Sequence, residues 1–235
     1  MTGATLTDRT VLETFVGMTD DIVAGVDVSA YLHRLAVRAA ELLGVYAVAV
    51  LIDGGRDRVL DVAGSSGEVG DLVARYEVTH SEGPGVDAFR SGAQVECPEL
   101  SAARWPRFAP FAMNRGLAAA HAVPCRGRDD VLGTLAMYAT RTGVLTSAVV
   151  ELSRAMANAV SLGVSAFRER ERADQLQYAL HSRVVIEQAK GMLAERLNIP
   201  VGDAFELLRG YSRNHNTKVH DVARDVLGGT LGLVP

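Results

Sequence analysis

The chain has 235 residues, a formal net charge of −4 at pH 7, and hydrophobic residues at 48% of its positions. This composition predicts a folded globular protein and excludes a chain that is basic throughout. No apolar run reaches the ~18–20 residues needed to cross a bilayer, and the polar start of the chain lacks the apolar core of a signal peptide. We therefore expect a cytoplasmic protein without membrane contact, whose two cysteines, Cys97 and Cys125, remain thiols.

Charge is distributed unevenly along the chain. Counting Arg and Lys against Asp and Glu gives about −5 for residues 1–165 (14 − 19) and about +1 for residues 166–235 (10 − 9). Both lysines, Lys190 and Lys218, lie in the second part. The asymmetry indicates two modules, of which only the second is suited to meet a polyanion such as a nucleic acid.

The first part of the chain shows helical and strand patterns in turn. Helices are predicted over residues 11–26 and 28–43, and Gly44 is a natural stop for the second of them. Apolar runs rich in β-branched residues predict strands over residues 45–52, 59–63, 119–124 and 131–139.

The intervening residues 64–118 are irregular, with Gly, Pro and Ser separating short helical stretches. A longer helix begins at Thr146, whose hydroxyl is placed to cap the first free amides. The order of helices, strands, a crossing segment, strands and a helix predicts an α+β domain, in which helices pack on a mostly antiparallel sheet.

From Ala166 onward the pattern is helical throughout. One helix of about 30 residues is expected to end at Leu197, with Asn198 in the left-handed cap position. Pro200 suits the first turn of a second helix, and Thr217 is placed to cap a third. Three helices with short connections predict a small bundle.

Several ordered motifs in the first part resemble those of a GAF sensor domain. The motifs are Ser81–Gly92, Arg104–Phe108, Arg115-Gly116, Ala122–Pro124 and Leu132–Leu135. The resemblance covers about residues 10–163, so residues 1–163 are interpreted as this domain. It implies a shape similar to a PAS domain, in which the sheet and a crossing segment enclose a cavity for a small molecule.

The resemblance leaves the ligand of this cavity open. Bulky apolar side chains near the expected cavity are candidate ligand contacts, although such residues more often belong to the core. These candidates are Trp105, Phe108, Phe111 and Met113. No bilin, haem or cyclic-nucleotide signature is present, so the cofactor is unknown and no metal site is expected.

A second and more specific set of motifs resembles an ANTAR domain. The motifs are Gln175–Arg183, Ile186–Leu193, Ala204–Arg209, Tyr211–Arg213 and Asp221–Ala223, in the order and spacing of the family. The pattern begins near residue 170, and we interpret residues 164–180 as a linking helix and residues 181–235 as the domain. The resemblance implies a regulator without catalytic activity that binds tandem short RNA hairpins and prevents a terminator stem from forming. Pro200 stands where many members carry Ser or Thr, which leaves the start of the second helix open.

Binding RNA requires donors directed at phosphates and polar groups that can read splayed bases. Arg183 and Lys190, seven residues apart, share one face of the first tail helix, and Arg209 and Arg213 form a second pair on the next helix. If these helices pack as antiparallel neighbours, the donors form one patch. The expected RNA contacts are Arg183, Gln188, Lys190, Arg209, Arg213 and Lys218. In the alternative, the charges only solvate the helix surface, and Glu187 pairs with Arg183.

A 4-3 spacing of apolar and small residues along the linking helix predicts the seam of a coiled coil. Its members are Leu152, Met156, Ala159, Gly163, Ala166, Ala173, Leu180 and Val184, with Arg170 and Gln177 as interruptions. We expect a homodimer in which this helix carries strain from the sensor to the RNA module. Residues 152–160 are also expected to pack on the sheet of their own chain.

Two other functions remain open. A three-helix bundle can present a recognition helix to the major groove of DNA, although the third helix offers only Lys218 and Arg224 beside two aspartates. Some GAF-fold proteins reduce methionine sulfoxide through cysteines, and Cys97 with Cys125 form a candidate attacking and resolving pair. The acidic neighbours of Cys97 disfavour its thiolate, and an enzyme has no need of the helical tail.

Overall fold

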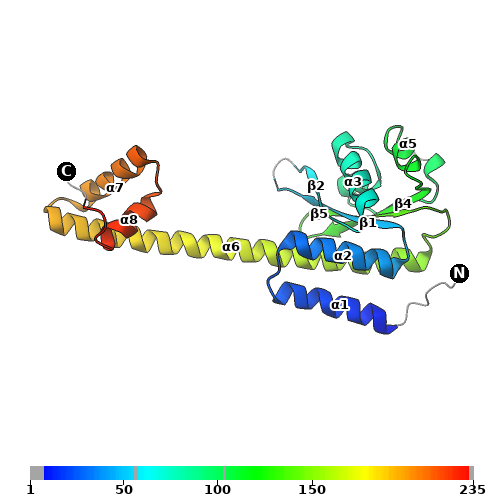
Figure 1. The fold of residues 1–235 in the computed structure, drawn as a ribbon, viewed down its shortest axis with the longest axis horizontal. Helices are drawn as coiled ribbons and strands as arrows, with labels where there is room; N and C mark the ends of the chain where they lie inside the picture. The colour runs from blue at the N-terminus through cyan, green and yellow to red at the C-terminus, as the bar shows by residue number, and fades with distance from the viewer. Residues whose placement is uncertain (1–7, 56–57, 103, 233–235) are drawn as a thin grey trace. The chain divides into compact units, whose positions relative to one another are not determined.

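The computed structural model describes residues 8–55, 58–102 and 104–232, and the chain divides into two compact units after Arg168 (Figure 1). The first unit contains α1 (Asp8–Val23), α2 (Val28–Leu43), β1 (Ala47–Asp53), β2 (Leu60–Ser65), α3 (Glu68–His80), α4 (Pro84–Ser91), β3 (Val95–Cys97), a 3-10 turn (Leu100–Ala102), α5 (Phe108–Met113), β4 (Ala119–Arg126) and β5 (Val131–Ala139). The helix α6 (Ser147–Leu197) belongs to both units, and the second is completed by α7 (Val201–His215) and α8 (Val219–Leu227).

The strands of the first unit form an antiparallel sheet in the order β2-β1-β5-β4-β3. The four predicted strands are confirmed, and β5 lies at the centre of the sheet between β1 and β4, which are also largely buried. The edge strand β3 lies in the segment predicted to be irregular, because its three residues are too few to show a strand pattern. The predicted α+β class is confirmed.

Helices cover both faces of this sheet. α1, α2 and the first part of α6 lie on one face, while α3 and α5 lie on the other (Figure 1). Successive strand residues point to opposite faces, so β1 sends Val48 and Val50 into the first of two cores. Its residues Ala49 and Leu51 enter the second core, which α4 also lines. Each face of the sheet is therefore buried.

Local signals set the ends of α2, which begins and ends where the sequence predicts. The carboxylate of Asp27 accepts hydrogen bonds from the amides of Ser29 and Ala30, at 3.0 and 3.1 Å. Gly44 has a φ of 62°, the left-handed conformation that ends a helix at little cost for glycine. The preceding helix lies three residues earlier in the chain than predicted, because α1 begins at Asp8 and ends at Val23.

The helix α6 is unbroken over 51 residues, longer than the two separate helical segments that the pattern predicts. The Thr146 hydroxyl accepts a hydrogen bond from the amide of Val149 at 3.4 Å, as expected of a cap. Met156 is fully buried on the sheet, and Leu152 packs against the same core. The predicted packing of residues 152–160 on their own sheet is confirmed, so the start of the predicted seam is occupied within the chain.

Contacts beyond Met156 tie α6 to the rest of the first unit. The Tyr31 hydroxyl donates to the carbonyl of Ala159 at 3.0 Å, and burial raises the pKa of Tyr31 to about 12. Gly163 allows this close approach, because a Cβ there would lie 2.3 Å from the Tyr31 ring. The Arg168 guanidinium donates to the carbonyl of Asp53 at 2.7 Å, which joins the end of β1 to α6.

The second unit is a small helical bundle with its own core. The core consists of Ala189, Leu193, Ala204, Leu208, Val222, Ala223 and Val226. Asn198 takes the predicted left-handed conformation, with a φ of 51°, and Asn216 ends α7 in the same way. None of the helices in the described part of the chain is both long and apolar enough to cross a membrane.

Two helix starts in this bundle differ from the prediction by one residue. Pro200 is the N-cap of α7 and not part of its first turn. Lys218, not Thr217, is the N-cap of α8. Thr217 is held by the end of α7 instead, because its carbonyl accepts a hydrogen bond from the Ser212 hydroxyl at 2.6 Å and its amide donates to the Ser212 carbonyl at 3.0 Å.

Candidate nucleic-acid interface

The contact between α6 and α7 brings two basic side chains to one aromatic ring. The Nζ atom of Lys190 lies 5.4 Å from the ring centroid of Phe205, and the Cζ atom of Arg209 lies 5.9 Å from it. Phe205 and Arg209 are one turn apart on α7, whereas Lys190 comes from α6. Because the face of an aromatic ring attracts cations, Phe205 holds two positive charges from different helices in one place.

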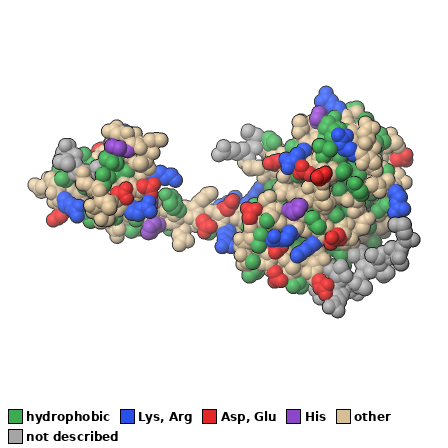
Figure 2. Space-filling model, in the orientation of Figure 1, with side chains coloured by type: hydrophobic (Ala, Val, Ile, Leu, Met, Phe, Trp, Pro, Cys, Tyr) green, Lys and Arg blue, Asp and Glu red, His purple; other side chains and the backbone are tan. Residues whose placement is uncertain are grey.

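Carboxylates accompany both of these cations. Lys190 forms an ion pair with Glu187 at 2.9 Å, and Arg209 forms one with Glu206 at 3.1 Å. The predicted alternative pairing of Glu187 with Arg183 is wrong, because Glu187 pairs with Lys190 instead. Figure 2 shows basic and acidic side chains interspersed on the face of the helical unit in view. An incoming phosphate would therefore compete with Glu187 and Glu206.

Three other predicted contacts are exposed and carry no ion pair within the described residues. They are Arg183, Arg213 and Lys218. Seven residues turn an α-helix by nearly two full turns, so Arg183 lies on the same side of α6 as Lys190. Arg213 follows Arg209 by one turn on α7. The structure thus gives two free guanidiniums on the same helix sides as the two cations that meet at Phe205.

Gln188 is turned away from Lys190. It precedes Lys190 by two residues, a rotation of about 200° around the helix axis. It lines a shallow hollow on α6 with the exposed side chains of Leu180, Arg183 and Val184. Gln188 is therefore near Arg183 but does not face the ring of Phe205.

Phe205 was not among the predicted contacts, and the structure leaves it half-buried beneath two cations. The spacing of Phe205 and Arg209 by four residues was the sequence signal that could have indicated this contact, since such pairs are neighbours on a helix.

Two other residues of the bundle have structural surroundings. Tyr211 packs against the bundle core, and its ring stacks on His215 at 3.8 Å. Gly191 has open space where a Cβ would stand, so the packing within the described bundle does not require its small size.

The histidines of the bundle form an aromatic group and not a metal centre. The ring of His220, on α8, lies 5.6 Å from that of Tyr178 and 5.9 Å from that of His181, both on α6. In the described residues, no three side chains of His, Cys, Asp or Glu come together to hold a metal ion.

The four candidate ligand contacts of the first unit have different environments. Trp105 is buried and its indole N–H donates to Asp87 at 3.0 Å, and Phe108 is fully buried in the core. Phe111 stacks on Tyr76 at 3.6 Å, and Met113 is exposed. None of these four lines the cavity of this unit beside β2, whose walls come from β2, α3 and α4.

The two cysteines cannot act together. Cys97 pairs with Ala120 across β3 and β4, so both side chains point to the same face of the sheet. Cys125 follows Ala120 by five residues, an odd number, and belongs to the core on the opposite face. Burial raises the pKa of both thiols, and no disulfide joins them. This geometry argues against an attacking and a resolving thiol.

One carboxyl group of the first unit is fully buried. The Oε1 atom of Glu77 accepts a hydrogen bond from the amide of Val86 at 2.7 Å, and its Oε2 atom accepts one from the Tyr138 hydroxyl at 3.1 Å. Burial raises the pKa of Glu77 to about 8, although both hydrogen bonds act in the opposite direction. The group therefore joins α3, α4 and β5 largely in its protonated form at neutral pH.

Two family models match the chain in succession. A model of the GAF domain matches residues 26–165, and a model of the ANTAR domain matches residues 174–227. The predicted succession of these two domains is confirmed. No curated protein sequence matches the chain significantly.

Solved structures resemble the first unit. The GAF domain of an Acinetobacter phosphoenolpyruvate-protein phosphotransferase matches with a TM-score of 0.53 and 16% identity, over 70% of this chain and 97% of that domain. The GAF domain of the Coxiella burnetii phosphoenolpyruvate-protein phosphotransferase gives 0.57 and 12%, over 70% and 98%. A free methionine-R-sulfoxide reductase from Neisseria meningitidis gives 0.53 and 16%, over 70% and 95%. At these identities the likeness establishes the fold alone.

Proposed function

This chain belongs to the GAF-domain family and carries an ANTAR domain after the GAF domain, and from that premise we propose that it is a cytoplasmic RNA-binding antitermination regulator. The two domains make it a signal-responsive regulator. In the proposed mechanism the GAF domain binds a small molecule, and the ANTAR bundle grips RNA hairpins before a terminator stem forms. The proposal includes no catalytic step.

The observation that supports RNA binding most directly is the meeting of Lys190 and Arg209 at the ring of Phe205. Donors from two helices offer phosphates a wider surface than one helix does, and single-stranded bases in hairpin loops can be read by polar side chains. The free guanidiniums of Arg183 and Arg213 extend the same helix sides and are available for phosphates.

The alternative function, DNA binding, requires α8 to act as a recognition helix, and the structure gives this alternative little support. His220, Val222 and Val226 are buried in the bundle, and Arg224 is bound to Asp221. A helix that enters the major groove needs free basic or amide side chains along an exposed face. Within α8 the donors are largely engaged or flanked by aspartates.

A competition experiment separates these readings. The full chain is bound to a labelled RNA that carries two short hairpins joined by a single-stranded linker, and unlabelled RNA or duplex DNA of equal length is added. We expect the RNA to displace the label at concentrations about tenfold or more below the DNA, because loop contacts add to the shared phosphate term. Equal displacement by the DNA would refute selective RNA binding. A hairpin pair with altered loop bases keeps the phosphate charge and tests whether the loops are read.

We also propose that the chain is a homodimer joined through α6. The side chains of Leu176, Leu180 and Val184 recur every four residues and are 67%, 69% and 54% exposed. Soluble proteins rarely leave such an apolar row uncovered over three helical turns, and a second copy of the same helix would cover it as a coiled coil. This row shares Leu180 and Val184 with the predicted seam but has Leu176 in place of Gln177, and the start of the predicted seam packs on the sheet.

The substitution Leu180→Glu should convert the dimer to a monomer. Light scattering of the unaltered protein is expected to give about twice the chain mass of 25.0 kDa, and the variant about that mass, because facing carboxylates would be buried in the seam. Leu162→Glu is the matched control, since Leu162 is also exposed on α6 but lies outside the seam. A monomeric unaltered protein at micromolar concentration would disprove the dimer.

A further inference from the structure

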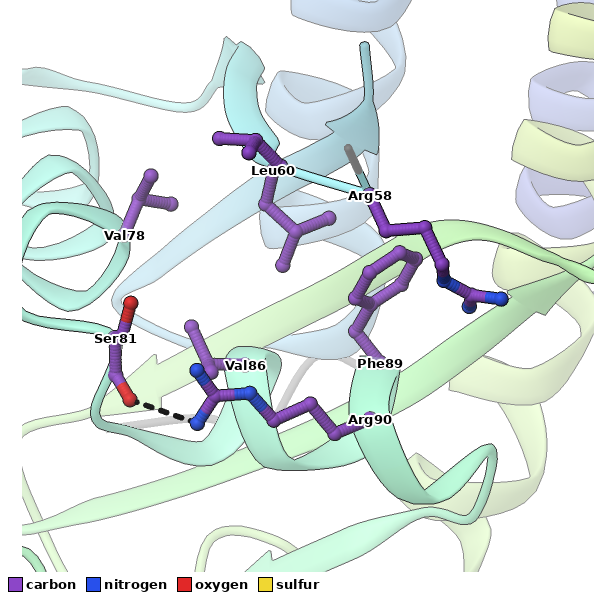
Figure 3. A pocket seen from close by; sticks show the side chains of 8 residues that line it. Arg58, Leu60, Val78, Ser81, Val86, Phe89 and Arg90 are labelled. Carbon is purple, nitrogen blue, oxygen red and sulfur yellow. Dashed lines mark hydrogen bonds between the residues drawn. The ribbon is translucent and has the colours of Figure 1, made fainter. Parts of the chain in front are cut away.

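The GAF domain contains a cavity of about 520 Å³ beside the edge strand β2. Figure 3 shows Leu60 of β2 above Val86 and Phe89 of α4, with the guanidinium of Arg58 beyond Phe89 and that of Arg90 on the opposite side, beside Ser81. The lining residues are Arg58, Val59, Leu60, Val78, Ser81, Val86, Phe89 and Arg90. Its middle is apolar and its ends are cationic, a distribution suited to a small amphipathic molecule.

The two arginines are exposed and largely free to bind. The Cζ atom of Arg58 lies 5.0 Å from the ring centroid of Phe89, so the guanidinium rests on an apolar wall. Arg90 donates one hydrogen bond, at 3.0 Å, to the carbonyl of Ser81. A guanidinium has five N–H donors, so most of those of Arg90 have no partner within the described chain. Neither arginine is in an ion pair with a described residue.

Among the described residues that line the cavity, none is acidic. Its apolar walls are formed by Leu60, Val78, Val86 and Phe89. Pockets of roughly 300–1,000 Å³ enclose ligands of drug-like size, so this cavity has room for an anion with a hydrocarbon body of one or two rings. Arginine binds carboxylates and phosphates through two parallel hydrogen bonds, which favours these two acid groups.

We propose that this cavity binds an organic anion, a carboxylate or a phosphate monoester with an apolar body, as the signal molecule of the GAF domain. One of the two arginines, Arg90 or Arg58, binds the acid group at its own end of the cavity, and Leu60, Val86 and Phe89 enclose the body. The proposal rests on the proposed function only in calling the bound molecule a signal. The binding itself is a property of the cavity and can be measured without RNA.

Calorimetric titration of the full chain with three matched probes tests the proposal. The probes are 1-naphthylacetate, 1-naphthyl phosphate and the neutral 1-naphthylacetamide. We expect both anions to bind about tenfold or more tightly than the amide, because charge-assisted hydrogen bonds to arginine exceed neutral ones in strength. Tighter binding of the phosphate would identify a phosphate monoester as the ligand class, and tighter binding of the acetate would identify a carboxylate.

The variants Arg58→Gln and Arg90→Gln locate the site. At least one of them should weaken anion binding about tenfold without changing the affinity for the amide. Arg141→Gln is the control, because Arg141 is exposed and follows the end of β5 remote from the β1–β2 turn. Binding of the amide as tight as that of the anions, wild-type affinity in both cavity variants, or no anion binding at millimolar concentration would each overturn the proposal. Hairpin binding by the ligand-free protein is measured separately, so its loss or retention tests the proposed function alone.

Discussion

Replacing Arg183 and Arg213 together with alanine should weaken hairpin binding by about 100-fold, because two charge-assisted contacts to phosphate are worth about 3 kcal/mol in total. Both guanidiniums are exposed and have no ion-pair partner within the described residues, so their removal leaves no carboxylate unpaired. The slope of log affinity against log salt should also become shallower by about 1.4, since fewer counterions are released. Filter binding at several salt concentrations measures both effects.

A charge-matched control separates the patch from net charge. The variant Arg170→Ala with Arg196→Ala removes the same two positive charges from the second unit, at exposed positions of α6 that have no ion pair among the described residues. We expect this control to bind hairpins with an affinity within about threefold of that of the unaltered protein. The two arginines that it lacks lie outside the patch, so they attract RNA only over distances at which salt screens the charge. Equal loss in the two double variants would mean that net charge, and not the patch, governs affinity. Circular dichroism checks that all variants remain helical.

Lys190 and Arg209 are less suitable for such a test, although they support the proposal more directly. The Lys190 side chain is only 16% exposed and packs over Phe205, so its loss would disturb the contact between α6 and α7. Removing Arg209 would also leave Glu206 without its partner. Weakened binding in these variants would mix a structural effect with the loss of a phosphate contact.

Short-range patterns predicted the elements whose causes are local. The ends of α2 depend on Asp27 and Gly44, which lie beside the helix they cap, and β1 lies within the apolar run 45–52. The strand β3 could not be found in this way, because three edge residues carry no periodicity. The helix α8 begins one residue later than predicted, because Thr217 is hydrogen-bonded to Ser212 at the end of α7. The preference of threonine for the N-cap position does not reveal this contact.

The sites depended on contacts between distant parts of the chain. Cys97 and Cys125 lie on opposite faces of the sheet because of the register in which β3 pairs with β4. This register cannot be predicted from the sequence alone. Trp105 was expected at a cavity, but its indole N–H is hydrogen-bonded to Asp87, 18 residues away in the sequence. The cavity lies beside β2 instead. Helical spacing placed Arg183 with Lys190 and Arg209 with Arg213 on their helices. Only the packing of α6 on α7 brings Lys190 and Arg209 to one ring.

The buried carboxyl of Glu77 makes the stability of the GAF domain depend on pH in an unusual direction. Its pKa is raised from 4.5 to about 8 in the folded protein, so the folded state keeps a proton that the unfolded state releases. Its contribution to stability is complete below pH 4.5 and is lost as the pH rises toward 8. At about 1.4 kcal/mol for each pH unit, the loss is on the order of 4 kcal/mol, a large part of the stability of an ordinary domain.

The substitution Glu77→Gln should remove this pH dependence, since an amide resembles the protonated acid in shape and carries no charge. The free energy of unfolding, from urea titrations at pH 5, 6, 7 and 8, should fall with pH in the unaltered protein relative to the variant, by on the order of 4 kcal/mol over the range. Taking the difference between the two proteins cancels the groups that both share. Glu68→Gln is the control on the same helix, because Glu68 is exposed in the first turn of α3, and its difference from the unaltered protein should stay constant with pH. A constant difference for Glu77→Gln as well would show that Glu77 is ionised in the folded protein, and that the contacts from Val86 and Tyr138 outweigh the effect of burial.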